Sequence, residues 1–241
     1  MKIAITGQGV LAGTTRECCK DLHEIEAVES RHIEVLWVCY DTPVSENGEA
    51  DYEWVIGQIQ ADLNRLNGDP VVLMSSQLSV LTTFRLSERF PLRFFAYSPE
   101  NVRVNSAVDD FMDQKRIVVG VPNGSRNSVL KALLTPICGN LIFTTCETAE
   151  LVKHALNCYL GMSIAYINEI AKVAAHVKAD MDVVSKALLT ERRISPNAPL
   201  KAGAPFGGGH LMRDIKHLES LAGAHGLKLP IITHIRESNA H

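Results

Sequence analysis

The sequence predicts an α/β fold, in which a doubly wound parallel sheet of about six strands is followed by an all-helical part. Three observations support this. The chain opens with an apolar run, a glycine-rich turn and a helical repeat, and strand and helix patterns then alternate as far as Thr145. Strand signals largely cease after that residue. We therefore place a domain boundary near residue 145, with a sheet domain over 1–145 and a helical domain over 146–241.

Composition and charge argue against several classes of function. The 241 residues are 46% hydrophobic and 21% charged, with a formal net charge of -3, as in an ordinary globular protein. Without a basic excess, neither nucleic acid nor an anionic membrane is an expected partner. No apolar run approaches the roughly 18 residues of a membrane span, and the first residues resemble a strand rather than a signal peptide. We expect a cytoplasmic protein that does not bind membranes.

The cysteines indicate a reduced core rather than a disulfide framework or a metal site. No two of them form a C-x-x-C pair, and most lie within apolar segments. They are Cys18, Cys19, Cys39, Cys138, Cys146 and Cys158.

The N-terminus is predicted to be a strand, a glycine turn and a helix. Lys2 to Thr6 is the apolar run, and Gly7 to Gly13 is the turn, which contains a G-x-G-x-x-A pattern. Such a turn can hold a pyrophosphate on backbone N–H groups at a helix N-terminus. A tight turn without a ligand remains the alternative. The helical repeat that follows consists of Leu11, Thr15, Cys18, Leu22 and Ile25.

The second half of this dinucleotide pattern is expected to be absent. It should be a strand that ends in an acidic residue about 20 positions further on, where the carboxylate takes ribose hydroxyls. His23 to His32 contains acids but no strand-like run. The next clear strand is Ile33 to Tyr40, which Asp41, Thr42 and Pro43 interrupt.

The remaining elements of the sheet domain follow in alternation, which implies parallel strands with helices on both faces. Ligands in such sheets bind at the carboxyl ends of the strands, so the loops after Thr6, Tyr40, Ser75 and Tyr97 should line the site. We predict helices over Asp51–Leu66, Thr83–Phe90 and Ser125–Leu134, and strands over Pro70–Ser75, Arg93–Tyr97, Arg116–Val121 and Asn140–Thr145.

The helical domain is predicted to begin with one long helix, Glu147–Lys178, and to continue with Met181–Leu189, Asp214–Ala224 and a further helix after Pro230. Asp180 is a plausible N-cap. The long helix is more apolar than one domain face requires, so we expect it to form a homodimer.

Polar residues at helical spacing mark a candidate site. Lys153 and Asn157 are four residues apart and can address the same ligand from one helix face. His210 and Asp214 have the same spacing and follow a glycine run that lets a loop approach a ligand closely. Four polar side chains could therefore converge on one cleft.

Several segments together resemble one enzyme family. They are Gly7–Gly13, Val35–Asp51, Ser98–Glu100, Asp110–Gly120, Glu147–Asn157, Tyr166–Glu169 and Gly207–Asp214. Their order and spacing resemble the UDP-glucose and GDP-mannose dehydrogenase family. The resemblance implies a Rossmann-like NAD-binding domain, a helical dimerisation domain and a sugar or nucleotide-sugar substrate.

The resemblance also assigns roles to residues. Glu100, Lys153, Asn157 and Asp214 match active-site positions of the family, and Lys153 would exchange a proton with the oxygen at the reacting carbon, with Asn157 as a donor beside it. The implied cofactor-binding residues are Gly7, Gly9, Val10, Leu11, Asp41, Thr42 and Glu147. The implied substrate-binding residues are Glu100, Lys153, Asn157, Phe206 and Gly207. Glu147 could equally be an ordinary first-turn acid favoured by the helix dipole.

The sequence departs from the family at its nucleophile. The family has a cysteine that attacks the aldehyde made by the first oxidation, and here that position is His210. An imidazole cannot form a thioester, so a two-electron reaction is expected. His210 with Asp214 could be a general-base dyad, or the histidine could fill the space of a lost cysteine in an inactive site. A metal held by His210, Asp214 and His217 is less favoured, and we predict none.

Three further departures from the family suggest weaker binding of cofactor and substrate. The segment between the glycine turn and Ile33 is short, the chain stops where the family continues into another α/β domain, and Gln77 replaces a threonine of the family. The leading hypothesis is an NAD(H)-dependent oxidoreductase acting on a sugar or sugar-nucleotide alcohol. The alternative is an inactive relic that serves as a binding or scaffolding dimer. Transient oxidation, as in an epimerase, would use the same residues.

Overall fold

The computed structural model describes residues 1–45, 49–207 and 209–240, which form two compact units. Unit 1 comprises Met1–Pro43 and Ala50–Lys153, and unit 2 comprises Val44–Glu49 and His154–His241. Helix α6 (Cys146–Val177) runs through the boundary, so its first two turns belong to unit 1 and the rest to unit 2. The domain boundary predicted near residue 145 lies at the start of this helix.

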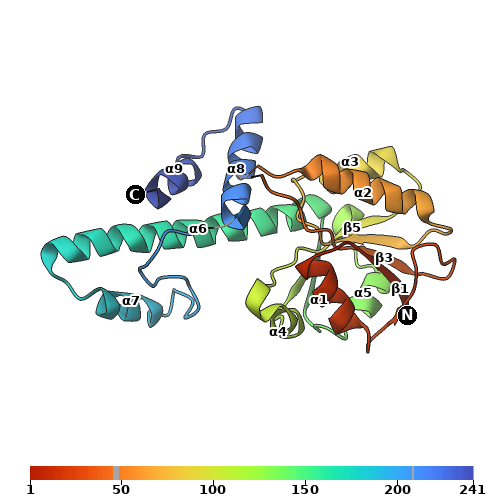
Figure 1. Cartoon of the computed structure of the whole chain (residues 1–241), viewed down its shortest axis with the longest axis horizontal. Coiled ribbons are helices and arrows are strands. Elements are labelled where there is room, and N and C mark those ends of the chain that lie inside the picture. The colour runs from red at the N-terminus through yellow and green to blue at the C-terminus, as the bar shows by residue number, and fades with distance from the viewer. Residues whose placement is uncertain (46–48, 208, 241) are drawn as a thin grey trace. The chain divides into compact units, whose positions relative to one another are not determined.

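A seven-stranded sheet in the order β2-β1-β3-β4-β5-β6-β7 forms the centre of unit 1 (Figure 1). Neighbouring strands are parallel except β5 and β6, which meet in antiparallel sense at Tyr97 and Gly120. The predicted α/β class is confirmed, with one antiparallel pair that the all-parallel prediction did not include. The strands are β1 (Lys2–Thr6), β2 (Glu24–Ile25), β3 (Val35–Val38), β4 (Val71–Met74), β5 (Phe95–Tyr97), β6 (Ile117–Gly120) and β7 (Leu141–Thr144).

The expectation that the second strand is absent is wrong. Strand β2 pairs with β1 through Lys2 with Glu24 and Ile3 with Ile25, and the Glu26 N–H donates to the Ile3 carbonyl at 2.8 Å. Two residues give too short a run for β-propensity to reveal it, and backbone pairing with β1 forms it instead. Because β2 pairs only with the first residues of β1, it ends well before the carboxyl edge of the sheet.

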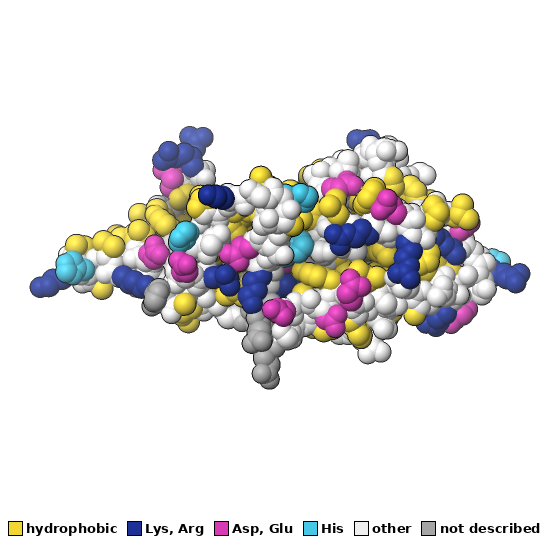
Figure 2. All heavy atoms as spheres, turned by 90° about the horizontal axis from the view of Figure 1, so that it is seen from above, with side chains coloured by type: hydrophobic (Ala, Val, Ile, Leu, Met, Phe, Trp, Pro, Cys, Tyr) yellow, Lys and Arg dark blue, Asp and Glu magenta, His cyan; other side chains and the backbone are white. Residues whose placement is uncertain are grey.

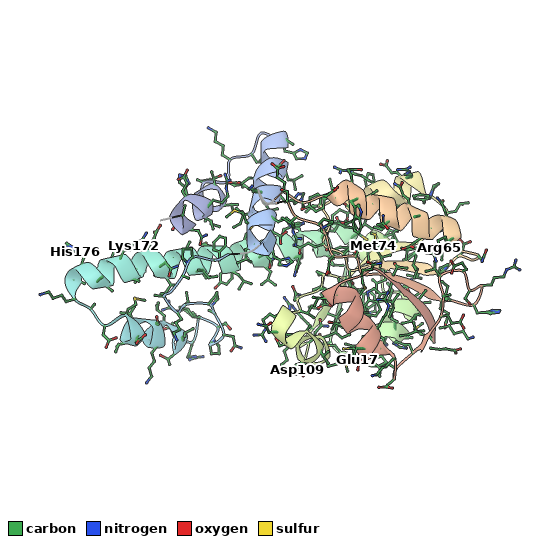
Figure 3. The ribbon with its side chains drawn as sticks, in the orientation of Figure 1. Glu17, Arg65, Met74, Asp109, Lys172 and His176 are labelled. Carbon is green, nitrogen blue, oxygen red and sulfur yellow. The ribbon has the colours of Figure 1, made fainter. Side chains whose placement is uncertain are left out.

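Helices cover both faces of this sheet. On one face, α1 (Val10–Cys19), α4 (Ala107–Met112) and α5 (Ser128–Leu134) pack against strand residues such as Ile3 and Ile5. On the other, α2 (Tyr52–Arg65) and α3 (Thr82–Arg89) pack against residues such as Ala4. Side chains that alternate along a strand point to opposite faces, which explains the two cores. Figure 3 labels Met74 of β4, Glu17 of α1 and Arg65 at the end of α2.

Helix α1 is shorter than its repeat suggested, and α4 was not predicted. Leu22 and Ile25 continue the helical spacing, but α1 ends at Cys19, whose carbonyl accepts from the Leu22 and His23 N–H groups at 3.0 and 2.9 Å. That turn directs the chain into β2. Short 3₁₀ turns at Val104–Ser106 and Pro122–Gly124 complete the unit.

Unit 2 consists of the rest of α6 with α7 (Met181–Leu189), α8 (Gly209–Ala224) and α9 (Pro230–Asn239). Asp180 caps α7, as predicted, by accepting from the Asp182 and Val183 N–H groups at 3.0 and 3.1 Å. Helix α8 crosses α6 (Figure 1). Its core with α6 and α9 consists of Cys158, Ala165, Ile215, Leu218 and Ile235.

Helix α8 begins at Gly209, earlier than the predicted start at Asp214. His210 is therefore a residue of the first helical turn rather than of a glycine loop. None of the helices in the described ranges combines the length and apolar character that a bilayer crossing requires.

Candidate active site

The glycine turn of unit 1 has the backbone geometry of a phosphate-binding turn. Gly7 and Gly9 have φ values of 114° and 97°, in the region that favours glycine. A Cβ on Gly7 would lie 2.3 Å from the Cys39 carbonyl oxygen, so only glycine allows β1 and β3 to approach this closely. Arg16 Nη2 donates to the Ile5 and Gly7 carbonyls at 2.9 Å each and so fixes the turn from α1. The N-terminus of α1 follows directly, as dinucleotide binding requires.

A carboxylate lies on this turn. The Val10 N–H donates to Asp41 Oδ2 at 3.0 Å, and a Cβ on Gly9 would lie 2.0 Å from the same oxygen. Thr42 beside it is buried, and its hydroxyl donates to the Gln77 carbonyl. Three of the predicted cofactor-binding residues, Gly9, Val10 and Asp41, are thus brought together. The Asp41 carboxylate, however, places a negative charge where phosphates would bind.

The acidic residue after β2 is engaged elsewhere. Lys2 Nζ donates to Glu26 Oε1 at 2.6 Å, and the Ser30 hydroxyl donates to Glu26 Oε2. These hydrogen bonds hold the pKa of Glu26 below its ordinary value. Since Lys2 lies at the start of β1, this carboxylate is held away from the carboxyl edge where a ribose would bind. The residues present therefore fit NAD at the glycine turn but not at the ribose or at Asp41.

Glu100 and Lys153 come together within unit 1. Glu100 follows β5, and Lys153 Nζ donates from α6 to the Glu100 carbonyl and, at 3.2 Å, to Asn101 Oδ1. The Glu100 carboxylate is half-buried and accepts from the Asn101 N–H at 2.7 Å. Desolvation by burial raises the pKa of Glu100, although the Asn101 N–H and the Lys153 charge oppose it. A carboxyl with a raised pKa thus lies close to an ammonium group.

The first turns of α6 also organise the loop after β4. The buried Glu150 carboxylate accepts from the Leu81 N–H at 2.7 Å, the Thr83 N–H at 2.9 Å and the Thr83 hydroxyl at 2.6 Å. Leu81 has a φ of 72°, which a leucine rarely adopts, so Glu150 holds a strained residue at the start of α3. Sequence reasoning did not single out Glu150. Glu147 is half-buried in the first turn of α6.

Asp214 is the centre of a buried polar network within unit 2. Asn157 Nδ2 donates to Asp214 Oδ2 at 2.5 Å, and His154 Nδ1 lies 3.2 Å from Asp214 Oδ1. Arg213 Nε lies 3.5 Å from the same Oδ1, and all four residues are at most 7% exposed. Burial alone would raise the pKa of Asp214, but the hydrogen bond and charge of His154, the Arg213 charge and the Asn157 amide outweigh it and lower the pKa.

The imidazole that lies beside Asp214 is thus His154, which sequence reasoning missed. Its ring packs against that of His217, with a centroid distance of 4.4 Å and the ring planes tilted by 33°. His210 is exposed, with Nδ1 3.3 Å from Arg213 Nη2, and the His210–Asp214 dyad remains a prediction. A signal was available, because His154 and Asn157 share the buried stripe of α6 that continues through Cys158, Gly161 and Ala165. Two polar residues in such a stripe require partners.

Phe206 and Gly207 precede α8. The Phe206 backbone is tied to Asn239 of α9 by hydrogen bonds of 2.8 and 3.1 Å, and its ring packs against the core of unit 2. Gly207 is exposed. Neither contact assigns a role toward a substrate, which remains a prediction.

The cysteines are all free and buried. Burial raises the pKa of Cys19, Cys146 and Cys158 to about 12, and that of Cys18 and Cys39 upward as well, so these thiols do not ionise readily. Among the described residues, no group of three or more His, Cys, Asp or Glu side chains could hold a metal ion.

Two family models match the chain. The NAD binding domain of the UDP-glucose/GDP-mannose dehydrogenase family matches residues 14–138, and the central domain of that family matches residues 147–241. Curated relatives include UDP-glucose 6-dehydrogenase of Rickettsia felis, 31% identical over 88% of this chain and 48% of its own length. UDP-glucose 6-dehydrogenase TuaD of Bacillus subtilis is 30% identical over 87% of this chain and 47% of its own. The chain thus spans about half the length of these relatives.

Solved structures have the same fold. A UDP-glucose dehydrogenase from Pyrobaculum islandicum superimposes with a TM-score of 0.85 at 20% identity, covering 99% of this chain and 68% of its own. A ternary complex of GDP-mannose dehydrogenase from Pseudomonas aeruginosa gives a TM-score of 0.68 at 17% identity, covering 100% of this chain and 68% of its own.

Proposed function

Because the chain belongs to the UDP-glucose/GDP-mannose dehydrogenase family, we propose that it is an NAD(H)-dependent oxidoreductase that transfers a single hydride between the cofactor and a sugar or sugar-nucleotide alcohol. NAD is the cofactor of the family, whose N-terminal part is an NAD binding domain. The observation that carries the proposal is His210, which stands where the family resemblance implies a nucleophilic cysteine. A single two-electron step needs no such nucleophile.

The absence of an available thiolate supports a stop after two electrons. Oxidation of an alcohol to an aldehyde breaks one C–H bond, passes the hydride to NAD⁺ and releases the hydroxyl proton. Further oxidation to an acid would need an adduct on the aldehyde, which the resemblance assigns to the cysteine. The thiol of Cys158, on the same helix as Lys153, is buried and has a pKa raised to about 12. A buried thiol that resists ionisation in this way is not activated as a nucleophile.

Lys153 and Glu100 are the proposed proton-handling groups. The Lys153 ammonium, held by the Glu100 carbonyl and Asn101 Oδ1, would stabilise negative charge on the reacting oxygen. The raised pKa of Glu100 brings its carboxyl closer to the range in which a group can accept and return a proton near neutral pH.

An inactive scaffold is a second candidate that two observations favour. Asp41 puts a negative charge on the cofactor turn, and Asp214 with Asn157 is fully engaged in a buried network that stabilises unit 2. Such a network explains these two polar residues without catalysis.

A second copy of this chain is the proposed partner of α6. Tyr159, Tyr166 and Val173 lie seven residues apart on this helix and are 50%, 49% and 60% exposed. Hydrophobic side chains are also visible at the left of Figure 2, where the C-terminal part of α6 lies. An apolar stripe with this spacing suits packing against another helix. Light scattering would then report twice the chain mass of 26.5 kDa.

Calorimetric titration with NAD and NADH, alone and with UDP-glucose or GDP-mannose present, tests the oxidoreductase. Binding of either dinucleotide, followed by formation of an aldehyde or its reduction, supports the proposal. Failure of both dinucleotides to bind under all these conditions would exclude it and favour the scaffold.

A further inference from the structure

The glycine turn carries a carboxylate where the phosphates of a dinucleotide would be held. Asp41 follows β3, and its Oδ2 accepts from the Val10 N–H at 3.0 Å. Val10 is the first residue of α1, and the first N–H groups of a helix lack partners within it. The same oxygen would lie 2.0 Å from a Cβ on Gly9. The carboxylate therefore rests directly on the backbone of the turn.

This contact differs from the ordinary capping of helices in the same chain. In α2, α5 and α7 the residue immediately before the helix supplies the cap, namely Asp51, Asn127 and Asp180. In α1 that residue is Gly9, which has no side chain, and the bond comes from Asp41, 31 positions from Val10 in the loop after β3. A distant carboxylate also serves α3, where Glu150 accepts from the Thr83 N–H, but α1 is the helix whose N-terminus follows the glycine turn.

We propose that Asp41 is an internal anion that competes with the pyrophosphate of a dinucleotide for the N-terminus of α1, and so sets the affinity of this chain for NAD(H). The inference rests on the proposed function, because it concerns the same cofactor turn. A helix N-terminus carries roughly half a positive charge and favours one nearby anion. A carboxylate already in contact with it would repel the negative charges of a pyrophosphate.

The missing ribose contact strengthens the expected effect. Glu26 is held by Lys2 and Ser30 near the start of β1, so it cannot supply the ribose hydrogen bonds of the usual pattern. Affinity for the cofactor then depends strongly on the phosphates and on the charge that they meet. At the N-terminus of α1 that charge is partly positive, and the Asp41 carboxylate makes it negative.

Two substitutions separate the effect of the Asp41 charge from the effect of a side chain bonded to the Val10 N–H. Asp41→Asn keeps an acceptor for the Val10 N–H but removes the charge, and Asp41→Gly removes both. We expect NADH to bind about tenfold more tightly to Asp41→Asn than to the unaltered chain, and more tightly still to Asp41→Gly. Asp180→Asn, at the carboxylate cap of α7, is the matched control and should bind NADH like the unaltered chain.

Titrations with inorganic pyrophosphate and with adenosine show which part of NADH is responsible for any increase in its affinity. Pyrophosphate affinity should rise in the same order as NADH affinity, whereas adenosine affinity should not change. An equal or lower NADH affinity of Asp41→Asn would overturn the inference, and a fall would mark Asp41 as an acceptor for ribose hydroxyls. Absence of NADH and pyrophosphate binding in every variant would overturn it as well.

The proposed function is judged separately, by NADH binding and turnover of the unaltered chain. Binding that is equal in the unaltered chain and Asp41→Asn would leave the oxidoreductase standing while removing the competing role of Asp41. Thermal unfolding of each variant without ligand establishes that it is folded. If Asp41→Gly proves too unstable, Asp41→Asn alone decides, since asparagine caps helices about as well as aspartate.

Discussion

Two carboxylates, the half-buried Glu100 of unit 1 and the fully buried Asp214 of unit 2, have pKa values that shift in opposite directions. In unit 1, burial raises the pKa of Glu100, and the nearby Lys153 charge compensates only in part. In unit 2, Asp214 is fully buried, yet its pKa is lowered because His154, Arg213 and Asn157 all stabilise the negative form. Partners rather than burial decide the sign.

The opposite shifts suit the two carboxyl groups to different roles. A raised pKa brings a carboxyl closer to the range in which it can exchange protons near neutral pH, as acid–base chemistry requires. A carboxylate with three partners and no exposure is fixed in its charged form and contributes to stability instead. The proposed proton handling therefore lies in unit 1, whereas the Asp214 network supports the architecture of unit 2.

Replacement of Lys153 by methionine breaks the catalytic half of this comparison and should have the largest effect. If Lys153 stabilises charge on the reacting oxygen, Lys153→Met should lower kcat by about 10² to 10⁴-fold. Lys172→Met, at an exposed position of the same helix, is the matched control (Figure 3). Equal loss of kcat in both variants, or none in Lys153→Met, would contradict the assignment.

Removal of Asp214 tests the structural role of the buried network in unit 2. Asp214→Ala leaves Arg213 buried without its carboxylate and should lower the free energy of unfolding by about 3–5 kcal/mol. Urea unfolding followed by circular dichroism measures this. Asp182→Ala, at an exposed position in the first turn of α7, should change the same quantity by less than about 0.5 kcal/mol. A small effect of Asp214→Ala would show that the network is not structural.

The pH dependence of stability sharpens the comparison, with smaller effects. The lowered pKa of Asp214 contributes stability that is present above its ordinary value of 3.8 and is lost as pH falls through the folded-state pKa. Glu100 has the opposite sign, because the folded state binds its proton more tightly. Its contribution is fully present below the ordinary value of 4.5 and is lost as pH rises through the raised pKa.

Two variants test whether Glu100 and Asp214 cause these changes of stability with pH. Glu100→Gln should remove the loss of stability above pH 4.5, and Asp214→Asn the loss below pH 3.8, in urea midpoints measured across both windows. Identical pH profiles of the unaltered chain and Glu100→Gln would contradict the raised pKa of Glu100.

Much of the fold was predictable because it follows from local patterns. The strand Lys2–Thr6 and the helix Met181–Leu189 were predicted to the residue, since a buried apolar run and a capped apolar repeat each determine their element. Strand β2 was not predictable, because two exposed residues become a strand only by pairing with β1. The start of α8 at Gly209 was not predicted because the glycine run suggests a loop; a Cβ at Gly209 would lie 3.1 Å from Val44, which only a tertiary contact specifies.

The candidate site was predictable by residue type but not by partner. Lys153 and Glu100 lie close together although 53 positions separate them, which no local pattern specifies. The Asp214 network contains His154 because α8 packs on α6, and the capping of α1 by Asp41 arises because β3 lies beside β1. Each depends on tertiary contacts between segments distant in sequence.

The most direct test of the central claim is the number of NADH molecules formed for each sugar consumed. Purified chain would be incubated with NAD and UDP-glucose or GDP-mannose, with NADH followed by absorbance and the sugar product identified by mass spectrometry. We predict one NADH for each sugar and an aldehyde product, because His210 cannot form the covalent adduct that a second oxidation needs. Two NADH for each sugar with a carboxylate product, or no NADH at all, would contradict the account.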